Sequence, residues 1–172
     1  FELASGDTLG IVGESGSGKS TLVRALLGLL PISRGDIQWQ GRSIAQFGAA
    51  PWRALRRVVQ PVFQDPLSSL DPRMRVRELL AEPLQAHGRD TRAVRELRYP
   101  HDLSGGQCQR IGSGGARMLG PEVLVLDEPV SALDVSIQAQ IMNLLVSLTA
   151  TSGVSLILVS HNLAVVRRLC QE

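Results

Sequence analysis

The sequence is poor in cysteine, aromatic residues and lysine. Cys108 and Cys170 lie far apart and fit no metal-ligand or disulfide pattern, which favours reduced thiols over a cross-link. Aromatic residues make up 3% of the chain, too few for the stacking platform of a single-strand nucleic-acid-binding protein. The arginine-rich segments 53–57 and 73–77 are therefore expected to be solvated faces, and no nucleic-acid partner is predicted.

Long apolar runs are missing as well. No run approaches the roughly 20 residues that a membrane-spanning helix needs. The first residues, FELASGD, lack the basic start and apolar stretch of a signal peptide. With 172 residues, 44% hydrophobic and 20% charged, the sequence predicts one soluble globular domain with room for a small attached subdomain.

Short apolar runs alternate with helical patterns along the chain. The expected strands are residues 8–13, 35–41, 58–63, 122–129 and 154–161, and the expected helices are 20–30, 75–84 and 137–148. Pro61 requires that its strand lie at a sheet edge or carry a bulge. This alternation predicts an α/β fold with a mostly parallel sheet flanked by helices, and ligands bound at the carboxyl ends of the strands.

The segment GESGSGKST (13–21) satisfies the pattern G-x-x-x-x-G-K-[ST] between a predicted strand and a predicted helix. Its glycines allow backbone N–H groups to turn towards phosphate oxygens, and the helix N-terminus adds positive potential. Lys19, the only lysine of the chain, is expected to reach the β- and γ-phosphates, and Ser20 to ligate Mg²⁺. A dinucleotide-binding G-x-G-x-x-G fails because Thr21 occupies its third glycine position. The residues predicted to bind a nucleoside triphosphate here are Gly13, Ser15, Gly16, Ser17, Gly18, Lys19, Ser20 and Thr21.

Two acids and a histidine follow predicted buried strands. Asp127 is placed to hold Mg²⁺, and Glu128 to orient or deprotonate an attacking water. An acidic pair after a strand can also be an ordinary solvated loop start, an interpretation that the phosphate loop disfavours. His161 ends another strand at the same edge and could contact the γ-phosphate, although a lone histidine is more often structural. His87 and His101 are interpreted as structural or surface residues.

Further motifs occur in a fixed order. They are GESGSGKST (13–21), VFQDP (62–66), LSGGQ (103–107), VLVLDEP (123–129), SALD (131–134) and LVSH (158–161). From Leu9 to about Val166 the chain resembles the nucleotide-binding subunit of ATP-binding-cassette (ABC) transporters. The segments FQDPLSSLDPRMRV, AEPLQAH and YPHDLSGGQ resemble the dipeptide and oligopeptide importer branch, which includes nickel importers.

The resemblance implies a P-loop NTPase core formed by residues 1–64 and 121–172, with an inserted helical subdomain at 65–120. It implies an ATPase that uses ATP and Mg²⁺ and pairs head to tail with a second ABC ATPase subunit, as a homodimer or a heterodimer. The LSGGQ turn of one subunit would then close on the γ-phosphate held by the other. The residues that the resemblance assigns to this contact are Ser104, Gly105, Gly106 and Gln107.

Other roles come from the same resemblance. Gln64 would sense Mg²⁺ beside Ser20 and Asp127, and it joins Glu128, the catalytic base, and His161, the γ-phosphate switch, as a catalytic residue. Asp134 would lie at the dimer contact. The other implied partners are transmembrane permease subunits and, indirectly, a separate solute-binding protein. The implied location is peripheral, on the cytoplasmic face of a bacterial or archaeal inner membrane.

The sequence departs from the family pattern in its lengths. It begins twelve residues before Gly13, and no residue can be assigned to stack on adenine. The segment between Glu82 and Tyr99 is short where the family has a longer helical stretch, and the chain ends soon after His161, before the family's closing elements.

The helix expected after LSGGQ reads IGSGGARMLG (111–120). Gly112, Gly114 and Gly115 would each cost about 1 kcal/mol relative to alanine, so roughly 3 kcal/mol together. A weakened cassette is therefore predicted, and a partial or degenerate cassette that binds nucleotide without turnover is the alternative. A cassette acting on nucleic acid or ribosomes is the third possibility, which the importer-like segment FQDPLSSLDP disfavours.

Overall fold

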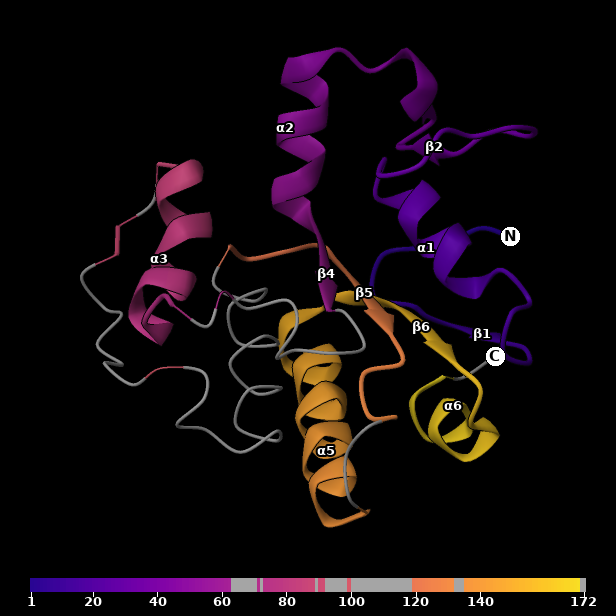
Figure 1. Cartoon of the computed structure of the whole chain (residues 1–172). Helices are drawn as coiled ribbons and strands as arrows, with labels where there is room; N and C mark the ends of the chain where they lie inside the picture. Colours follow the sequence, from indigo (N-terminus) through magenta and orange to yellow (C-terminus); the bar gives the residue numbers. More distant parts are fainter. Residues whose placement is uncertain are drawn as a thin grey trace.

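A four-stranded parallel sheet forms the centre of the molecule in the computed structural model (Figure 1). The structure describes residues 1–62, 71, 73–88, 90–91, 99, 119–131 and 135–170. In spatial order the strands are β1 (Thr8–Val12), β6 (Ser155–Ser160), β5 (Val123–Asp127) and β4 (Val59–Val62). All three neighbouring pairs are parallel, which confirms the mostly parallel sheet predicted from the sequence.

Helices pack on both faces of this sheet because its central strands are apolar on both sides. The described helices are α1 (Lys19–Leu26), α2 (Ala49–Val58), α3 (Val76–Ala86), α5 (Val135–Ser152) and α6 (Leu163–Leu169). Val123 and Val125 of β5 belong to the core cluster that includes α1, whereas Leu124 and Leu126 belong to the cluster that includes α5 and α6. Successive strand residues point to opposite faces, so a continuous apolar run places this strand between two helical layers.

Strand β4 lies at the edge of the sheet, as the proline in it requires. Pro61 has no N–H to donate to a neighbouring strand, and β4 pairs with β5 on one side only. The edge position predicted from Pro61 is therefore confirmed.

Helix α1 is shorter than the helix predicted over residues 20–30. It ends at Leu26, and Gly28 adopts the left-handed conformation with φ +66°. The N–H groups of Leu29 and Leu30 both donate to the carbonyl of Arg24, at 2.8 and 3.3 Å. Glycine tolerates this conformation and the chain reverses there, so the helix stops before Pro31.

The strand predicted over residues 35–41 is reduced to a small hairpin. Strands β2 (Gln38–Trp39) and β3 (Arg42–Ser43) pair antiparallel, and the short helix η1 (Ile44–Gln46) follows. The two turn residues, Gln40 and Gly41, have φ of 50° and 75°, as in a tight type I′ turn.

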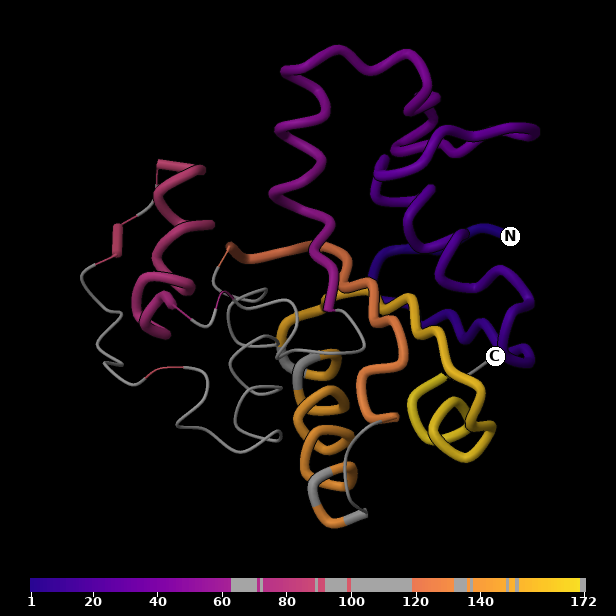
Figure 2. Tube along the Cα trace, viewed as in Figure 1, coloured from indigo at the N-terminus to yellow at the C-terminus, as the bar shows by residue number. Residues whose placement is uncertain are grey.

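The N-terminal segment is attached to the sheet through Ser155, and Figure 2 shows this segment running into β1. The N–H of Gly6 donates to the Ser155 hydroxyl at 2.8 Å, and that hydroxyl donates to the carbonyl of Ala4 at 3.2 Å.

Within the described part of the chain, no helix has the length and apolar character needed to cross a membrane.

Candidate nucleotide-binding site

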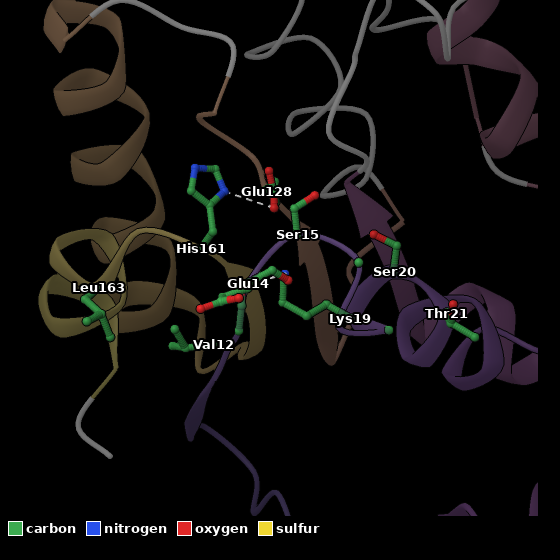
Figure 3. A pocket seen from close by; sticks show the side chains of 12 residues that line it. Val12, Glu14, Ser15, Lys19, Ser20, Thr21, Glu128, His161 and Leu163 are labelled. Carbon is green, nitrogen blue, oxygen red and sulfur yellow. Dashed lines mark hydrogen bonds and ion pairs between the residues drawn. The ribbon is translucent and has the colours of Figure 1, made fainter.

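Three adjacent strands deliver the candidate site residues to one edge of the sheet. The phosphate loop (13–18) follows β1, Asp127 ends β5, and His161 follows β6. Because β1, β6 and β5 are parallel neighbours, their carboxyl ends meet at the same edge, where α/β proteins bind ligands. A cavity of about 780 Å³ opens there (Figure 3). It is lined by Val12, Gly13, Glu14, Ser15, Gly16, Gly18, Lys19, Ser20, Thr21, Glu128, His161 and Leu163.

The phosphate loop depends on three glycines. Gly16 and Gly18 have φ of 81° and 94°, in the region that disfavours other residues. A Cβ atom at Gly13 would lie 2.6 Å from the hydroxyl of Ser17, closer than van der Waals contact allows. Gly18 is also the N-cap of α1 and provides no side-chain cap, so the first turn of the helix faces the loop with unsatisfied N–H groups. Such groups bind phosphate oxygens.

Lys19 is buried inside this loop, with 8% of its surface exposed. Its ammonium group donates to the carbonyls of Gly13 and Glu14 at 2.7 and 2.6 Å and lies 3.5 Å from the hydroxyl of Ser17. Burying a charge is costly unless it is hydrogen-bonded, and the two carbonyls meet this need. The loop thus holds a compact positive charge at its centre.

Ser20 and Asp127 form the second component of the site. The Ser20 hydroxyl donates to the Asp127 carboxylate at 3.3 Å, which joins the start of α1 to the end of β5. Asp127 is 8% exposed. Hydroxyl and carboxylate oxygens are the ligand types that Mg²⁺ prefers, usually with few protein ligands and with substrate phosphates completing the shell. This pair fits the predicted magnesium site.

Glu128 and His161 form the third component. The Nδ1 atom of His161 lies 3.0 Å from a carboxylate oxygen of Glu128, and both residues line the cavity (Figure 3). The histidine side chain is 56% exposed and the glutamate side chain 15% exposed. Glu128 has φ +49°, rare for a residue other than glycine. Its N–H donates to the carbonyl of Val159 at 2.8 Å, and the N–H and hydroxyl of Ser131 donate to its own carbonyl at 3.2 and 3.1 Å.

These contacts fix the glutamate on three sides. A non-glycine residue with positive φ is strained and persists only where its surroundings hold it. The carboxylate faces His161 and lines the same cavity as the phosphate loop.

The structure therefore brings together the predicted loop residues, Asp127, Glu128 and His161. The predicted residues Gln64, Ser104, Gly105, Gly106, Gln107 and Asp134 lie outside the described residues. Three residues that were not predicted as site residues also line the cavity: Val12, Leu163 and Glu14, the last at a variable position of the phosphate-loop motif. Their position within or next to a motif is the only signal in the sequence that could have indicated them.

The fold and the phosphate loop together define a P-loop NTPase. A family model described as ABC transporter matches residues 1–131, and an AAA-domain model, whose description includes the AbiEii toxin of type IV toxin–antitoxin systems, matches residues 102–167. The first match covers most of the chain. This chain belongs to the ABC transporter family, as the sequence motifs predicted.

Curated relatives place it near oligopeptide transport proteins. The chain is 48% identical over 187 residues to the oligopeptide transport ATP-binding protein OppF of Haemophilus influenzae, covering 98% of this chain and 56% of that protein. It is 52% identical over 188 residues to the oligopeptide transport ATP-binding protein OppD of Mycobacterium tuberculosis, covering 100% of this chain and 31% of that protein. The alignment with OppD is 188 residues long, whereas this chain has 172, so the alignment includes OppD residues that have no counterpart here. The chain spans about half the length of the OppF proteins it matches.

Solved structures share the fold over almost the whole chain. CbiO1 of Clostridium perfringens, described as part of the ABC transporter complex cbiONQ, matches with a TM-score of 0.78 and 28% identity, covering 99% of this chain and 73% of that one. The ATP-binding cassette MJ0796, in a dimeric post-hydrolysis state with ADP and Pi, matches with a TM-score of 0.81 and 26% identity, covering 98% and 80%. The predicted P-loop α/β fold is confirmed.

Proposed function

We propose that this chain binds ATP and hydrolyses it with Mg²⁺ to energise an importer of peptides or similar small solutes. The observation that carries the proposal is that Lys19, Ser20 and the Glu128–His161 pair line one cavity, with Asp127 hydrogen-bonded to Ser20 beside it. The names of its relatives support the peptide class, because they are oligopeptide transport ATP-binding proteins.

Nucleotide binding is assigned to the phosphate loop. The N–H groups around Gly16 and Gly18 would hold the β-phosphate, and Lys19 would exchange a carbonyl of its own loop for a γ-phosphate oxygen. The exchange is favourable because an ammonium–phosphate contact joins opposite charges in a site shielded from water. Ser20 and Asp127 would hold Mg²⁺, with Gln64, and the ion would neutralise charge on the phosphates.

Hydrolysis is assigned to Glu128 and His161. The oxygen of a water molecule would attack the γ-phosphorus while the bond from that phosphorus to the bridging oxygen of ADP breaks. The carboxylate of Glu128 would orient the water and accept its proton. His161, hydrogen-bonded to that carboxylate, would keep it aimed at the water and contact the γ-phosphate.

Pairing with a second cassette completes the proposed site. Ser104, Gly105, Gly106 and Gln107 would cover the partner's γ-phosphate, and Asp134 would lie at the contact. The proposed organisation is a core of residues 1–64 and 121–172 with a helical subdomain at 65–120. We further propose permease subunits and an indirect solute-binding protein as partners, and a peripheral place on the cytoplasmic face of the membrane.

The test is the rate of Mg-ATP hydrolysis by the purified chain as a function of its concentration. A rate that rises faster than linearly is expected, because two chains would build each site. Glu128→Gln should abolish this rate while it retains ATP and accumulates a dimer. Hydrolysis by Glu128→Gln at the parent rate would show that the base is misassigned, and a folded parent chain without any hydrolysis would refute the proposed activity.

A further inference from the structure

Positive charge is concentrated in one part of this chain. Residues 34–57 contain five arginines and one acid, a net charge of +4, against +2 for all 172 residues. These arginines are Arg34, Arg42, Arg53, Arg56 and Arg57, and all five are exposed. The acid is Asp36, whose carboxylate accepts hydrogen bonds from the side chains of Ser43 and Gln38, and these bonds lower its pKa. Among the described residues, none of the five arginines forms an ion pair.

Two of these arginines belong to a continuous stack with two aromatic rings. The guanidinium of Arg42 lies 5.4 Å from the ring centre of Phe47, and that of Arg56 lies 5.5 Å from the ring of Trp52. The two rings contact each other edge to face, with centroids 5.9 Å apart. We call Arg42, Phe47, Trp52 and Arg56 the arginine–aromatic strip. Stacking restrains each guanidinium plane and leaves its N–H edge available to an anion.

The strip is fixed to the body of the protein. The ring of Trp52 packs against Gly28 so closely that a Cβ atom there would collide with it. Next to Trp52, the guanidinium of Arg53 donates to the carbonyl of Ala86, the last residue of α3, at 2.7 Å. Helix α2 is therefore held on two sides, and its arginines are presented from a rigid support.

The strip also lies apart from the nucleotide site. Helix α1 begins at the phosphate loop with Lys19 and ends two residues before Gly28, which contacts the strip. The strip and the phosphate loop are thus at opposite ends of α1, about 12 Å of helix apart. Figure 1 shows α2 and the β2–β3 hairpin projecting from the sheet on the side opposite α5. The positive charge here is not part of the cradle for ATP phosphates.

We propose that the arginine–aromatic strip, with Arg57 beside it, binds the anionic phospholipid headgroups of a membrane surface. The choice of a membrane rests on the proposed function, in which the chain works at a bilayer. The strip supplies what such a surface recognises: exposed guanidinium groups that form no ion pair within the described part of the chain, presented from helix α2 and the adjoining hairpin. Trp52 and Phe47 are half-buried and hold the two guanidinium groups in place, so the expected attraction to the membrane is electrostatic.

The test uses the full chain and vesicles of phosphatidylcholine, with or without phosphatidylglycerol, in a sedimentation assay. The chain should bind only vesicles that contain phosphatidylglycerol, and added salt should weaken binding. Each arginine near an anionic surface contributes about fivefold to binding, so Arg42→Gln/Arg56→Gln should weaken the binding about 25-fold. The single variant Arg57→Gln, on the same helix as Arg56, should weaken binding to the vesicles about fivefold. It replaces the double variant in the test if the double variant does not fold.

The matched control removes the same charge elsewhere. Arg77 on α3 and Arg167 on α6 are exposed, so Arg77→Gln/Arg167→Gln lowers the net charge equally without touching the strip. This control should keep at least half of the parent's affinity for the anionic vesicles. Equal losses in both double variants would mean that net charge alone attracts the chain, and this would overturn the proposal. Failure of the parent chain to prefer anionic vesicles would overturn it as well.

Competition and ATP binding separate the remaining outcomes. Polyglutamate and a single-stranded oligonucleotide serve as competitors for the vesicles. If either displaces the chain when its anionic groups are less concentrated than those of the lipid, the strip prefers an acidic protein or a nucleic acid, and the proposal is wrong. ATP binding should be unchanged in the strip variants, because Lys19 and its loop are untouched. Binding to anionic vesicles by a chain that neither binds nor hydrolyses ATP would refute the proposed function and leave the strip's role in place.

Discussion

The Nδ1 atom of His161 and a carboxylate oxygen of Glu128 lie 3.0 Å apart, although the two residues belong to different strand ends. Strands β5 and β6 are parallel neighbours, and the N–H of Glu128 donates to the carbonyl of Val159, two residues before His161. The backbone itself therefore brings the two side chains into register. Glu128 is mostly buried whereas His161 is half-exposed, so the histidine can respond to a ligand in the cavity while the glutamate stays fixed.

Replacing His161 with alanine should lower the rate of ATP hydrolysis by at least about tenfold, because Glu128 would lose the group that orients its carboxylate. The affinity for ATP should change little, since the phosphate loop remains intact. Steady-state kinetics should show the loss in kcat and a nearly constant KM. The control is His87→Ala at the C-cap of α3, which should retain the parent rate. A higher KM for ATP with an unchanged kcat would contradict the positioning role of His161.

Replacing Lys19 with alanine should abolish measurable ATP binding. The ammonium group is the only lysine charge in the chain, and its removal also leaves the carbonyls of Gly13 and Glu14 without this donor. Lys19→Arg should not restore binding, because the larger planar guanidinium does not fit a space filled by a compact ammonium. Equilibrium dialysis with labelled ATP measures the affinity. Parent-like binding by either variant would rule out Lys19 as the phosphate ligand.

The sheet could be predicted from the sequence because burial on both faces leaves a continuous apolar signal. Segments 122–129 and 154–161 were expected as strands and contain β5 and β6. Helix α2 was not expected, because residues 53–57 were interpreted from their arginines as a solvated face, although Trp52, Leu55 and Val58 recur at helical spacing. The early end of α1 was missed as well, since it depends on the left-handed conformation of Gly28, which the residue type permits but does not require.

The candidate site, like the fold, could be predicted only in part. Motif spacing predicted that the phosphate loop, Asp127, Glu128 and His161 would meet at one sheet edge, and the structure places them there. The positive φ of Glu128 could not be predicted, because it results from contacts with Val159 and Ser131 that form only in the folded chain. The roles assigned to Gln64 and to the LSGGQ turn stay predictions, since these residues lie outside the described part of the chain.

Restoring alanine at Gly112, Gly114 and Gly115 should strengthen ATP-dependent dimerisation. These residues also lie outside the described part of the chain, so the prediction rests on helix propensity alone. Three replacements should stabilise the expected helix after LSGGQ by roughly 3 kcal/mol and present Ser104 more firmly to a partner. Light scattering with ATP, in the Glu128→Gln background that prevents turnover, measures the dimer fraction. Adding Lys19→Ala should remove the gain, and an unchanged dimer fraction in the triple-alanine variant would refute the helix argument.

Replacing Gly28 with alanine should lower the free energy of unfolding by about 3 kcal/mol, because the new methyl group meets the ring of Trp52 in a conformation that already disfavours a side chain. Gly88 provides a matched control. It has the same φ of +66° as Gly28, but a Cβ atom there meets nothing within 4 Å. Gly88→Ala should therefore carry only the conformational cost of about 1 kcal/mol. Urea denaturation of the two variants measures the difference, which reports the contact between α1 and α2. Equal losses in both variants would mean that Trp52 moves aside freely, and the arginine–aromatic strip would then lack the rigid support on which its preorganisation depends.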